Sequence, residues 1–333
     1  MLRNAVLALA TLLLAGCETL SYYAQAVGGH LEIMAAAQPV ARLIADPQTP
    51  VDLRQRLELT QRIRDFATSE LKLPDNGSYR SYAALPRPFV VWNVVAAPAL
   101  SLEPVKSCFP VAGCVSYRGF FARADANEHA RALRAEGHDV YLYGVPAYST
   151  LGRFDDPLLS TFIQYSEGEI ARLVFHELAH QVAYAKDDST FNESFAVAVE
   201  RAGLRRWLSG READLKALSG VEQRTEAFTA RLEEARGRLH KLYQMRLAPD
   251  EMRRRKAAEL ALLKAELAKF PRLAAIVPNN AFLAARATYT QLVPQFEKLL
   301  AEEGGDLSRF YERVKTLAAS ERYKRGPFSS PNR

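Results

Sequence analysis

The sequence predicts a mostly helical α+β protein that contains a small sheet and a long antiparallel helical hairpin. Two short apolar runs, residues 89–95 and 140–143, have the composition of strands, and the pattern is helical before them and from Glu167 almost to the end. The chain has 333 residues, of which 48% are apolar and 25% are charged. This balance is typical of a globular protein with a sizeable core and excludes a disordered or collagen-like chain.

The first 16 residues are expected to be a signal peptide rather than a part of the fold. Arg3 precedes an apolar run that is too short to span a bilayer and that ends in Leu14-Ala15-Gly16-Cys17. This ending resembles the lipoprotein box of exported bacterial lipoproteins. The resemblance implies cleavage before Cys17 and acylation of Cys17, which would anchor the mature chain to a membrane, facing the periplasm. The residue after Cys17 is Glu18. An Asp at this position would resemble the signal that retains lipoproteins in the inner membrane, so Glu18 favours the outer membrane. An ordinary secretory signal with a nearby cysteine is the alternative.

Export would place the other two cysteines, Cys108 and Cys114, in an oxidising compartment. Five residues separate them, and Pro110 and Gly113 among these are turn formers. We therefore expect a disulfide that closes a tight loop. A metal site is the alternative, although no histidine and no third cysteine lies nearby in the sequence.

The expected elements divide the chain into five parts. The N-terminal helices are separated by Pro47 and Pro50. The next region contains the two strands with a helix at 127–136 between the strands, and a further helix over 167–185 follows. A segment dense in Glu, Arg, Lys, Ala and Leu comes next, and Leu247-Ala248-Pro249-Asp250 interrupts it, which predicts the hairpin. The expected parts are a signal peptide at 1–16, an N-terminal helical segment at 17–73, an α+β core at 74–210, the hairpin at 211–270 and a C-terminal helical part at 271–333.

Charge and motifs exclude several classes of function. The formal net charge is +6, and no basic patch interleaved with aromatic residues accompanies it, so no nucleic-acid partner is expected. The charges of the hairpin are typical of solvated helix faces with pairs four residues apart. The sequence contains no Gly-rich phosphate loop and no Gly-x-Ser-x-Gly elbow.

Residues 176–180 read His-Glu-Leu-Ala-His, and this motif indicates the chemistry of the chain. On a helix the two histidines are neighbours on one face, so both rings can reach one Zn²⁺ ion. Glu177 lies about 100° around the helix and can act as general base on a water beside the metal without becoming a ligand. Two ordinary helix histidines are the alternative, but the chain has only six histidines, which makes a chance coincidence rare.

A catalytic zinc needs a third protein ligand, and the segment after the motif offers two glutamates. Twelve residues separate Glu193 from His180, and nineteen separate Glu200 from it, the spacing of thermolysin-like enzymes. The two glutamates are about 10.5 Å apart along a helix, so both cannot bind the same ion. Thr190 and Glu193 also fit a capping box, in which Glu193 would only bond the backbone.

The two motifs together, His176-Glu-Leu-Ala-His180 and Asn192-Glu193-Ser194-Phe195-Ala196, resemble those of the gluzincin metallopeptidases, where an Asn-Glu-x-x-Ser/Ala motif supplies the third ligand. Residues 108–120, 146–157 and 278–281 with Tyr289 resemble segments of a family of bacterial zinc aminopeptidases. The resemblance implies a gluzincin-like core, a Zn²⁺ ion held by His176, His180 and Glu193, and peptide hydrolysis with Glu177 as general base. The chain lacks the Gly-x-Met-Glu-Asn segment that captures the free amine of the substrate in well-characterised zinc aminopeptidases.

Other residues are candidates for substrate contact. Tyr148 or Tyr289 could stabilise an oxyanion, and Asn280 is a further candidate for contact with the substrate. Asp155 and Asp156 could bind a substrate amine, although as turn residues before a proline they need no such role.

The sequence thus predicts a membrane-anchored zinc peptidase, of the aminopeptidase kind, that acts in the periplasm on peptides. One alternative is a non-catalytic envelope lipoprotein scaffold, which binds another envelope protein through the 211–270 hairpin. A zinc hydrolase that cleaves a non-peptide amide, such as one in cell-wall material, is another.

Overall fold

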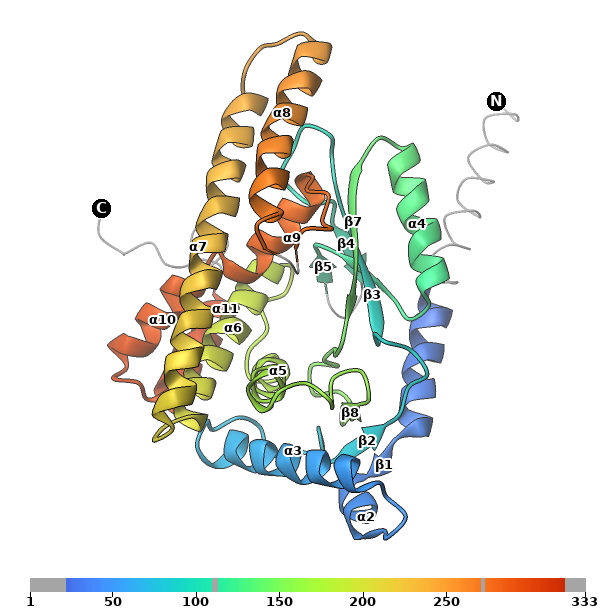
Figure 1. The fold of residues 1–333 in the computed structure, drawn as a ribbon, viewed down its shortest axis with the longest axis vertical. Helices are drawn as coiled ribbons and strands as arrows, with labels where there is room; N and C mark the ends of the chain where they lie inside the picture. The colour runs from blue at the N-terminus through green and yellow to red at the C-terminus, as the bar shows by residue number, and fades with distance from the viewer. Residues whose placement is uncertain (1–21, 110–112, 271–272, 321–333) are drawn as a thin grey trace.

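The computed structural model describes residues 22–109, 113–270 and 273–320, which form a mostly helical structure with small sheets (Figure 1). The predicted α+β class is therefore confirmed at that level. No helix among these residues is both long enough and apolar enough to cross a membrane. Cys17 and the rest of the expected signal peptide lie outside the described residues.

A three-stranded antiparallel sheet separates two helices. Its strands follow the order β6-β3-β7, with β3 at Val91–Ala97, β6 at Arg118–Phe120 and β7 at Asp139–Val145. Helix α4 (Arg123–Ala135) packs on one face through Ala126 and Ala130, and α9 (Asn280–Thr290) packs on the other through Ala281 and Ala285. Because both faces are covered, the residues of β3 other than Asn93 are apolar on both faces instead of alternating with polar ones.

The N-terminal part forms a second small sheet beneath the first. A helix covers residues 22–36, and α2 (Val40–Ala45) and α3 (Val51–Ser69) follow it, with Pro50 as the N-cap of α3. Strand β1 (Gln38–Pro39) pairs antiparallel with β2 (Ser81–Ala83), which pairs parallel with β8 (Leu158–Leu159). These short pairings join residues between 42 and 76 positions apart in the sequence, so local sequence patterns give little sign of them.

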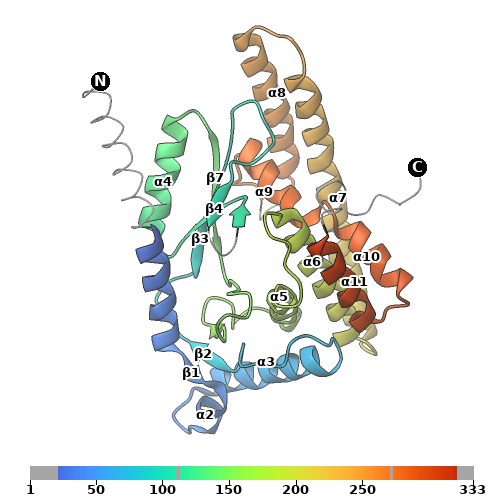
Figure 2. The ribbon, with the colours of Figure 1, turned by 180° about the vertical axis from the view of Figure 1, so that it is seen from behind.

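Helices α5 (Glu167–Ala179) and α6 (Ser189–Trp207) cross closely in the main core. A Cβ atom on Gly203 of α6 would lie 2.7 Å from side-chain atoms of both Leu71 and Phe175, so only glycine fits at this crossing. Helices α10 (Val293–Glu302) and α11 (Leu307–Ala319) cover the far side of α6, where Phe296 and Phe310 contact Phe195. Figure 2 shows α3 passing beneath α5 and the C-terminal helices beside α6.

The helix expected over 167–185 is shorter in the structure, because α5 ends at Ala179. Gln181 contacts Asn76 and Ser78 through its side-chain amide, at 2.7 and 3.1 Å. The backbone of Ala185 bonds the side chain of Asn192 instead of a preceding helical turn. The N–H groups of Gln181 and Val182 still bond the carbonyls of Leu178 and Ala179, so the chain leaves α5 through tight turns before the tertiary bond at Ala185.

Helices α7 (Glu212–Tyr243) and α8 (Pro249–Leu267) lie side by side at the edge of the structure and are joined by residues 244–248 (Figure 1). Ion pairs connect their outer faces, between Arg231 and Glu266 at 3.1 Å and between Arg238 and Glu259 at 2.7 Å. Their inner apolar face shares one core with α9. The buried residues of that core include Leu232, Leu239, Leu263, Leu267, Phe282 and Leu283.

The two cysteines of the central region lie on a short antiparallel pair, β4 (Ser107–Phe109) and β5 (Gly113–Val115). The structure joins Cys108 and Cys114 by a disulfide with an S–S distance of 2.06 Å. Gly113 has φ +74°, a left-handed conformation that glycine adopts without strain. A side chain at this position would also collide with Asp187, whose carboxylate accepts the N–H of Cys114 at 2.6 Å.

Candidate metal centre

The two motif histidines lie at the C-terminal end of α5. His176 is in its last turn, and His180 is its C-cap, still in helical conformation at φ −59° and ψ −21°. The spacing of one helical turn is therefore kept although the helix ends, and the two ring centroids are 4.9 Å apart. At the other end, Ser166 and Glu169 form a capping box that fixes where α5 begins.

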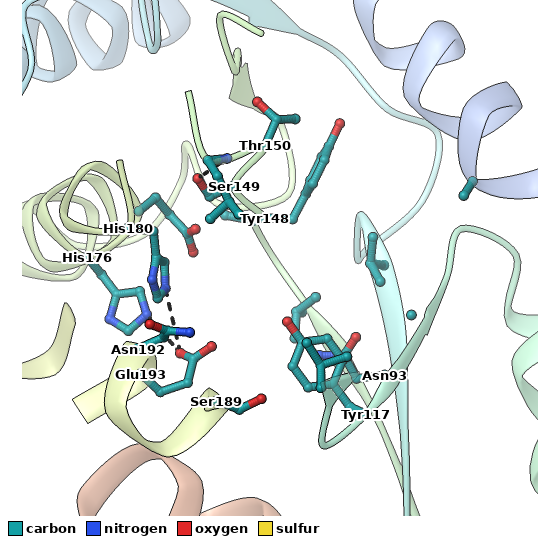
Figure 3. A pocket seen from close by; sticks show the side chains of 18 of the residues that line it. Asn93, Tyr117, Tyr148, Ser149, Thr150, His176, His180, Ser189, Asn192 and Glu193 are labelled. Atoms are coloured by element: carbon teal, nitrogen blue, oxygen red, sulfur yellow. Dashed lines mark hydrogen bonds and ion pairs between the residues drawn. The ribbon is translucent and has the colours of Figure 1, made fainter. Parts of the chain in front are cut away.

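Glu193 brings its carboxylate from α6 to both histidines (Figure 3). Its Oε2 lies 3.2 Å from Nε2 of His176 and 3.7 Å from Nε2 of His180. The three ligand atoms lie within 4.8 Å of one another, so the three residues form a group that could hold a metal ion. Two imidazoles and one carboxylate suit zinc and leave coordination positions open. The donor set fits the ion that the sequence predicts.

The start of α6 places Glu193 through its two neighbours in the sequence. Asn192 accepts the N–H of Ala185 at 2.7 Å and donates to its carbonyl at 2.8 Å, which joins α6 to the chain leaving α5. Ser194 is fully buried and accepts the N–H of Leu292 at 3.2 Å, which joins α6 to the segment after α9. Asp188 is the N-cap and accepts the N–H of Phe191 at 2.7 Å. The capping box considered for Thr190 and Glu193 is therefore not formed.

Glu200 lies two turns after Glu193 on α6 and contacts the same cluster. Its Oε2 lies 3.0 Å from Nδ1 of His176, on the opposite side of the ring from Glu193, and its Oε1 accepts hydrogen bonds from Arg172 at 2.6 and 3.1 Å. Burial raises the pKa of Glu200, but the hydrogen bond to His176 and the charge of Arg172 outweigh it and lower the pKa overall. Glu200 is thus placed to orient His176, as carboxylates behind metal-binding histidines do.

Glu177 is a fourth carboxyl group facing this cluster. It lines the same cavity as the two histidines and Glu193. Burial raises the pKa of Glu177 to about 7, and the positive charge of His176 opposes the rise. Burial also lowers the pKa of His180 to about 4, so its ring is neutral near pH 7 and a nitrogen lone pair is available to a metal ion.

A cavity of about 760 Å³, with largely apolar and aromatic walls, opens beside the candidate metal-binding group of His176, His180 and Glu193. It brings together two of the candidates for substrate contact, Tyr148 and Tyr289. The ring of Tyr289 stacks on that of His176 with a centroid distance of 6.4 Å. The hydroxyl of Tyr148 is 2.7 Å from Nδ1 of His30. Tyr117, which sequence reasoning did not single out, also lines this cavity, and burial followed by the charge of Glu193 raises its pKa well above the usual value.

The structure does not bring Asn280 to the cavity. Its side chain is fully buried at the start of α9, where it accepts from the hydroxyl of Tyr243 at 2.8 Å and donates to the carbonyls of Pro98 and Ala99. These hydrogen bonds join α7, α9 and the residues that follow β3. In this structure Asn280 therefore holds helices together and lies outside the cavity wall.

The two candidate aspartates differ in their environment. Asp155 is exposed, whereas Asp156 is 1% exposed and accepts the N–H of Thr150 at 2.9 Å. Neither lines the cavity. The carboxylate of Asp156 instead fixes the loop that carries Tyr148 and Thr150 into the cavity wall, which is a turn-forming role.

Sequence reasoning missed the residues that form the cavity wall opposite the metal-binding group. Tyr22, Tyr23 and His30 come from the N-terminal helix, and Asn93 comes from β3. Nothing in the local sequence distinguishes these residues from core or surface positions. The close pair Tyr22-Tyr23 beside polar residues was the one available signal, and it is weak.

Comparison with known proteins places the chain in a family. The model of a family described as "Putative aminopeptidase" matches residues 21–327. Neither a curated protein nor a solved structure matches the chain. The family match includes both motifs, the cavity walls and the α7–α8 pair. Because it spans most of the sequence, this protein belongs to that aminopeptidase family.

Proposed function

We propose that this protein is a zinc-dependent peptidase with the gluzincin arrangement of groups. The observation that carries the proposal is the convergence of His176, His180 and Glu193 in one cavity with a further carboxyl group, Glu177. Family membership supports hydrolysis of peptides from the amino terminus. When bound, zinc would supply Lewis-acid chemistry, which polarises a carbonyl group and acidifies a water molecule.

The other roles belong to side chains of the protein. Glu177, with a pKa near 7, takes a proton from the water that attacks the peptide carbonyl. As the C–N bond breaks, Glu177 passes this proton to the leaving amine and returns to its starting state. Glu200 and Arg172 hold the ring of His176 in the orientation that directs Nε2 toward Glu193. Tyr289, stacked on His176, lies where a phenol could donate to a developing oxyanion.

The substitution Glu177→Gln tests this mechanism. The variant keeps all three ligands but cannot accept a proton, so we expect zinc content equal to that of the parent and a loss of peptide hydrolysis of at least about 100-fold. Zinc is measured by mass spectrometry of the purified protein and hydrolysis with a peptide library read at free amino termini. His176→Ala is the matched control, because it should lose zinc and activity together. Hydrolysis by Glu177→Gln at the parental rate would refute the mechanism.

We further propose that the mature chain is a lipoprotein anchored through Cys17 and facing the periplasm. The support comes from the Leu14-Ala15-Gly16-Cys17 sequence and from the cysteine pair, since disulfides persist in oxidising compartments. A peptidase at that site would act on peptides that reach the envelope.

A further inference from the structure

The cavity has a polar side and an aromatic side. The metal-binding group and Glu177, from α5 and α6, form the polar side, and Figure 3 shows Tyr117, Asn93 and Tyr148 across the space from them. Glu177 and Glu193 are the only carboxylates among the described lining residues, and no lysine or arginine occurs among them. A charged substrate side chain that entered the aromatic side would therefore lose its hydration without gaining a partner of opposite charge.

The N-terminal helix, residues 22–36, forms much of the aromatic side. In Figures 1 and 2 it lies on the opposite side of the molecule from α6. Gln25 fixes it to the sheet, because its Nε2 donates to the carbonyl of Gly119 at 3.4 Å and its Oε1 accepts the N–H of Phe121 at 3.1 Å. The ring of Tyr22 stacks on Phe109 with centroids 5.3 Å apart. The helix is thus a fixed wall of the cavity.

The position of this wall depends on one close contact. Phe121 lines the cavity and packs edge-to-face on Tyr148 with centroids 5.8 Å apart. Its ring also abuts Gly29 of the helix, so that a Cβ atom on Gly29 would lie 2.2 Å from Cγ of Phe121. A Cβ atom on the neighbouring Gly28 would meet no atom within 4 Å. Gly29 therefore sets how near the helix stands to Phe121, and Gly28 does not.

We propose that the aromatic side of the cavity is a subsite for a bulky uncharged side chain of the substrate, aromatic or branched aliphatic, and that the contact of Gly29 with Phe121 sets its size. This inference rests on the proposed function and adds the substrate class to it. The volume of about 760 Å³ falls in the range of ligand-binding cavities and exceeds what the metal-binding group alone requires. Burial of an aromatic side chain against these rings supplies the selectivity.

Binding is measured first, without turnover. Peptides Xaa-Ala-Ala-Ala, with Phe, Leu, Gly, Asp or Lys as the first residue, are titrated calorimetrically into the full-length Glu177→Gln protein loaded with zinc. We expect the Phe and Leu peptides to bind at least about tenfold more tightly than the Gly peptide, and the Asp and Lys peptides to bind no better than Gly. Equal affinity across the series, or preference for a charged residue, would overturn the subsite.

The two neighbouring glycines then provide a matched pair of variants. Gly28→Ala and Gly29→Ala make the same change in the same helix, but only the second collides with Phe121. We expect Gly29→Ala to reduce the ratio of kcat/KM for the Phe peptide over the Gly peptide about tenfold, with zinc content unchanged, and Gly28→Ala to keep the parental ratio. Identical ratios in both variants would contradict the role of Gly29.

A second variant covers the case in which Gly29→Ala fails to fold. Phe121→Leu removes the ring without adding a collision, and it should shift the same ratio while thermal unfolding stays cooperative. A ratio unchanged in Phe121→Leu would also overturn the proposal. Failure of the proposed function would appear as a parent protein without zinc or hydrolysis. Failure of the subsite alone would appear as an active parent that binds zinc but shows no preference for Phe or Leu in the calorimetric series.

Discussion

At the scale of single residues, the position of His176 explains why the sequence offers two glutamates as candidates for the third ligand. Glu193 and Glu200 are seven residues apart on one face of α6, and the imidazole ring lies between them. Nε2 faces Glu193 and Nδ1 faces Glu200. Only Glu193 also reaches His180, at 3.7 Å. The resemblance carried by the Asn192-Glu193 motif favours Glu193 over Glu200, but only the crossing of α5 and α6, which no local pattern specifies, shows which carboxylate reaches both histidines.

This division of roles predicts different effects for two equivalent substitutions. Glu200→Gln keeps all three ligands and loosens the ring of His176, so zinc affinity should fall about 10- to 100-fold. Glu193→Gln removes a ligand and should reduce zinc affinity considerably further. Competition with a chelator of known affinity measures both. A larger loss in Glu200→Gln than in Glu193→Gln would show that Glu200 is the ligand.

Asp156 is a buried carboxyl group whose second oxygen has no hydrogen-bond partner among the described residues. Burial raises its pKa from 3.8 to about 6, and the N–H of Thr150 opposes the rise. Between these two pH values the folded state holds more protons than the unfolded state, so the free energy of unfolding falls as the pH rises. Above pH 6 the full cost of about 3 kcal/mol is present.

Asp156→Asn should therefore stabilise the protein at pH 7–8, by an amount on the order of 1–3 kcal/mol, and flatten the dependence of stability on pH between 4 and 6. The asparagine oxygen can still accept from Thr150. Urea unfolding across that pH range measures the effect, with Asp155→Asn as the exposed control. If Asp156→Asn were less stable than the parent at pH 8, the carboxylate would have a partner that stabilises its charged form.

At the scale of elements, patterns that rest on local contacts are predictable from the sequence. The strand expected at 140–143 is the centre of β7, the helix expected at 127–136 overlaps α4, and Pro249 begins α8 after the expected break. Elements that depend on distant partners were missed or misjudged. Strands β1, β2 and β8 pair across long separations, and the helix expected to reach residue 185 ends at Ala179, while the backbone of Ala185 bonds Asn192.

The β4–β5 pair is an element whose effect on the metal centre can be measured. Its disulfide closes a short loop, and Asp187, which accepts the N–H of Cys114, belongs to the chain between α5 and α6. Replacing both cysteines, Cys108→Ser with Cys114→Ser, should lower the free energy of unfolding by about 2 kcal/mol, because the unfolded chain gains loop entropy. It should also weaken zinc binding, since the neighbouring loop places Glu193.

Thermal unfolding with and without reductant tests this expectation. Reductant should lower the Tm of the parent toward that of the double variant and leave the double variant unchanged. A parent whose unfolding is insensitive to complete reduction would show that the β4–β5 pair does not constrain the fold.

At the scale of the whole molecule, segments far apart in the sequence surround the candidate metal centre. Ile33, Phe175, Phe195 and Phe310 share one core, which joins the N-terminal helix, α5, α6 and α11. The α7–α8 pair is attached to this body through α9, which also carries Tyr289, and through Leu215 and Leu218 at the start of α7. The sequence predicts the pair as a separate segment, but the shared core with Phe282 shows that its inner face is a part of the fold. Any partner would have to bind its outer, charged face.

The expected lipid anchor and the cavity lie close together along the chain. Cys17 precedes Tyr22, a residue of the cavity wall, by five positions. Five residues span at most about 18 Å even when fully extended, so acylation of Cys17 would hold the aromatic side of the cavity near the bilayer surface. The anchor would thus restrict where the enzyme acts without contributing a group to the reaction.

Cys17→Ser should consequently release the protein from the membrane and leave its chemistry intact. We expect the parent to partition into a detergent phase, with an intact mass that includes acyl chains, and the variant to remain in the aqueous phase. Both should have the same kcat/KM on soluble peptides, whereas hydrolysis of a peptide attached to vesicles should fall in the variant. Glu18→Asp is the matched control, because it keeps the acylated cysteine and should change only the membrane in which the protein is found. A parent protein of unmodified mass in the aqueous phase would refute the anchor and favour an ordinary secretory signal.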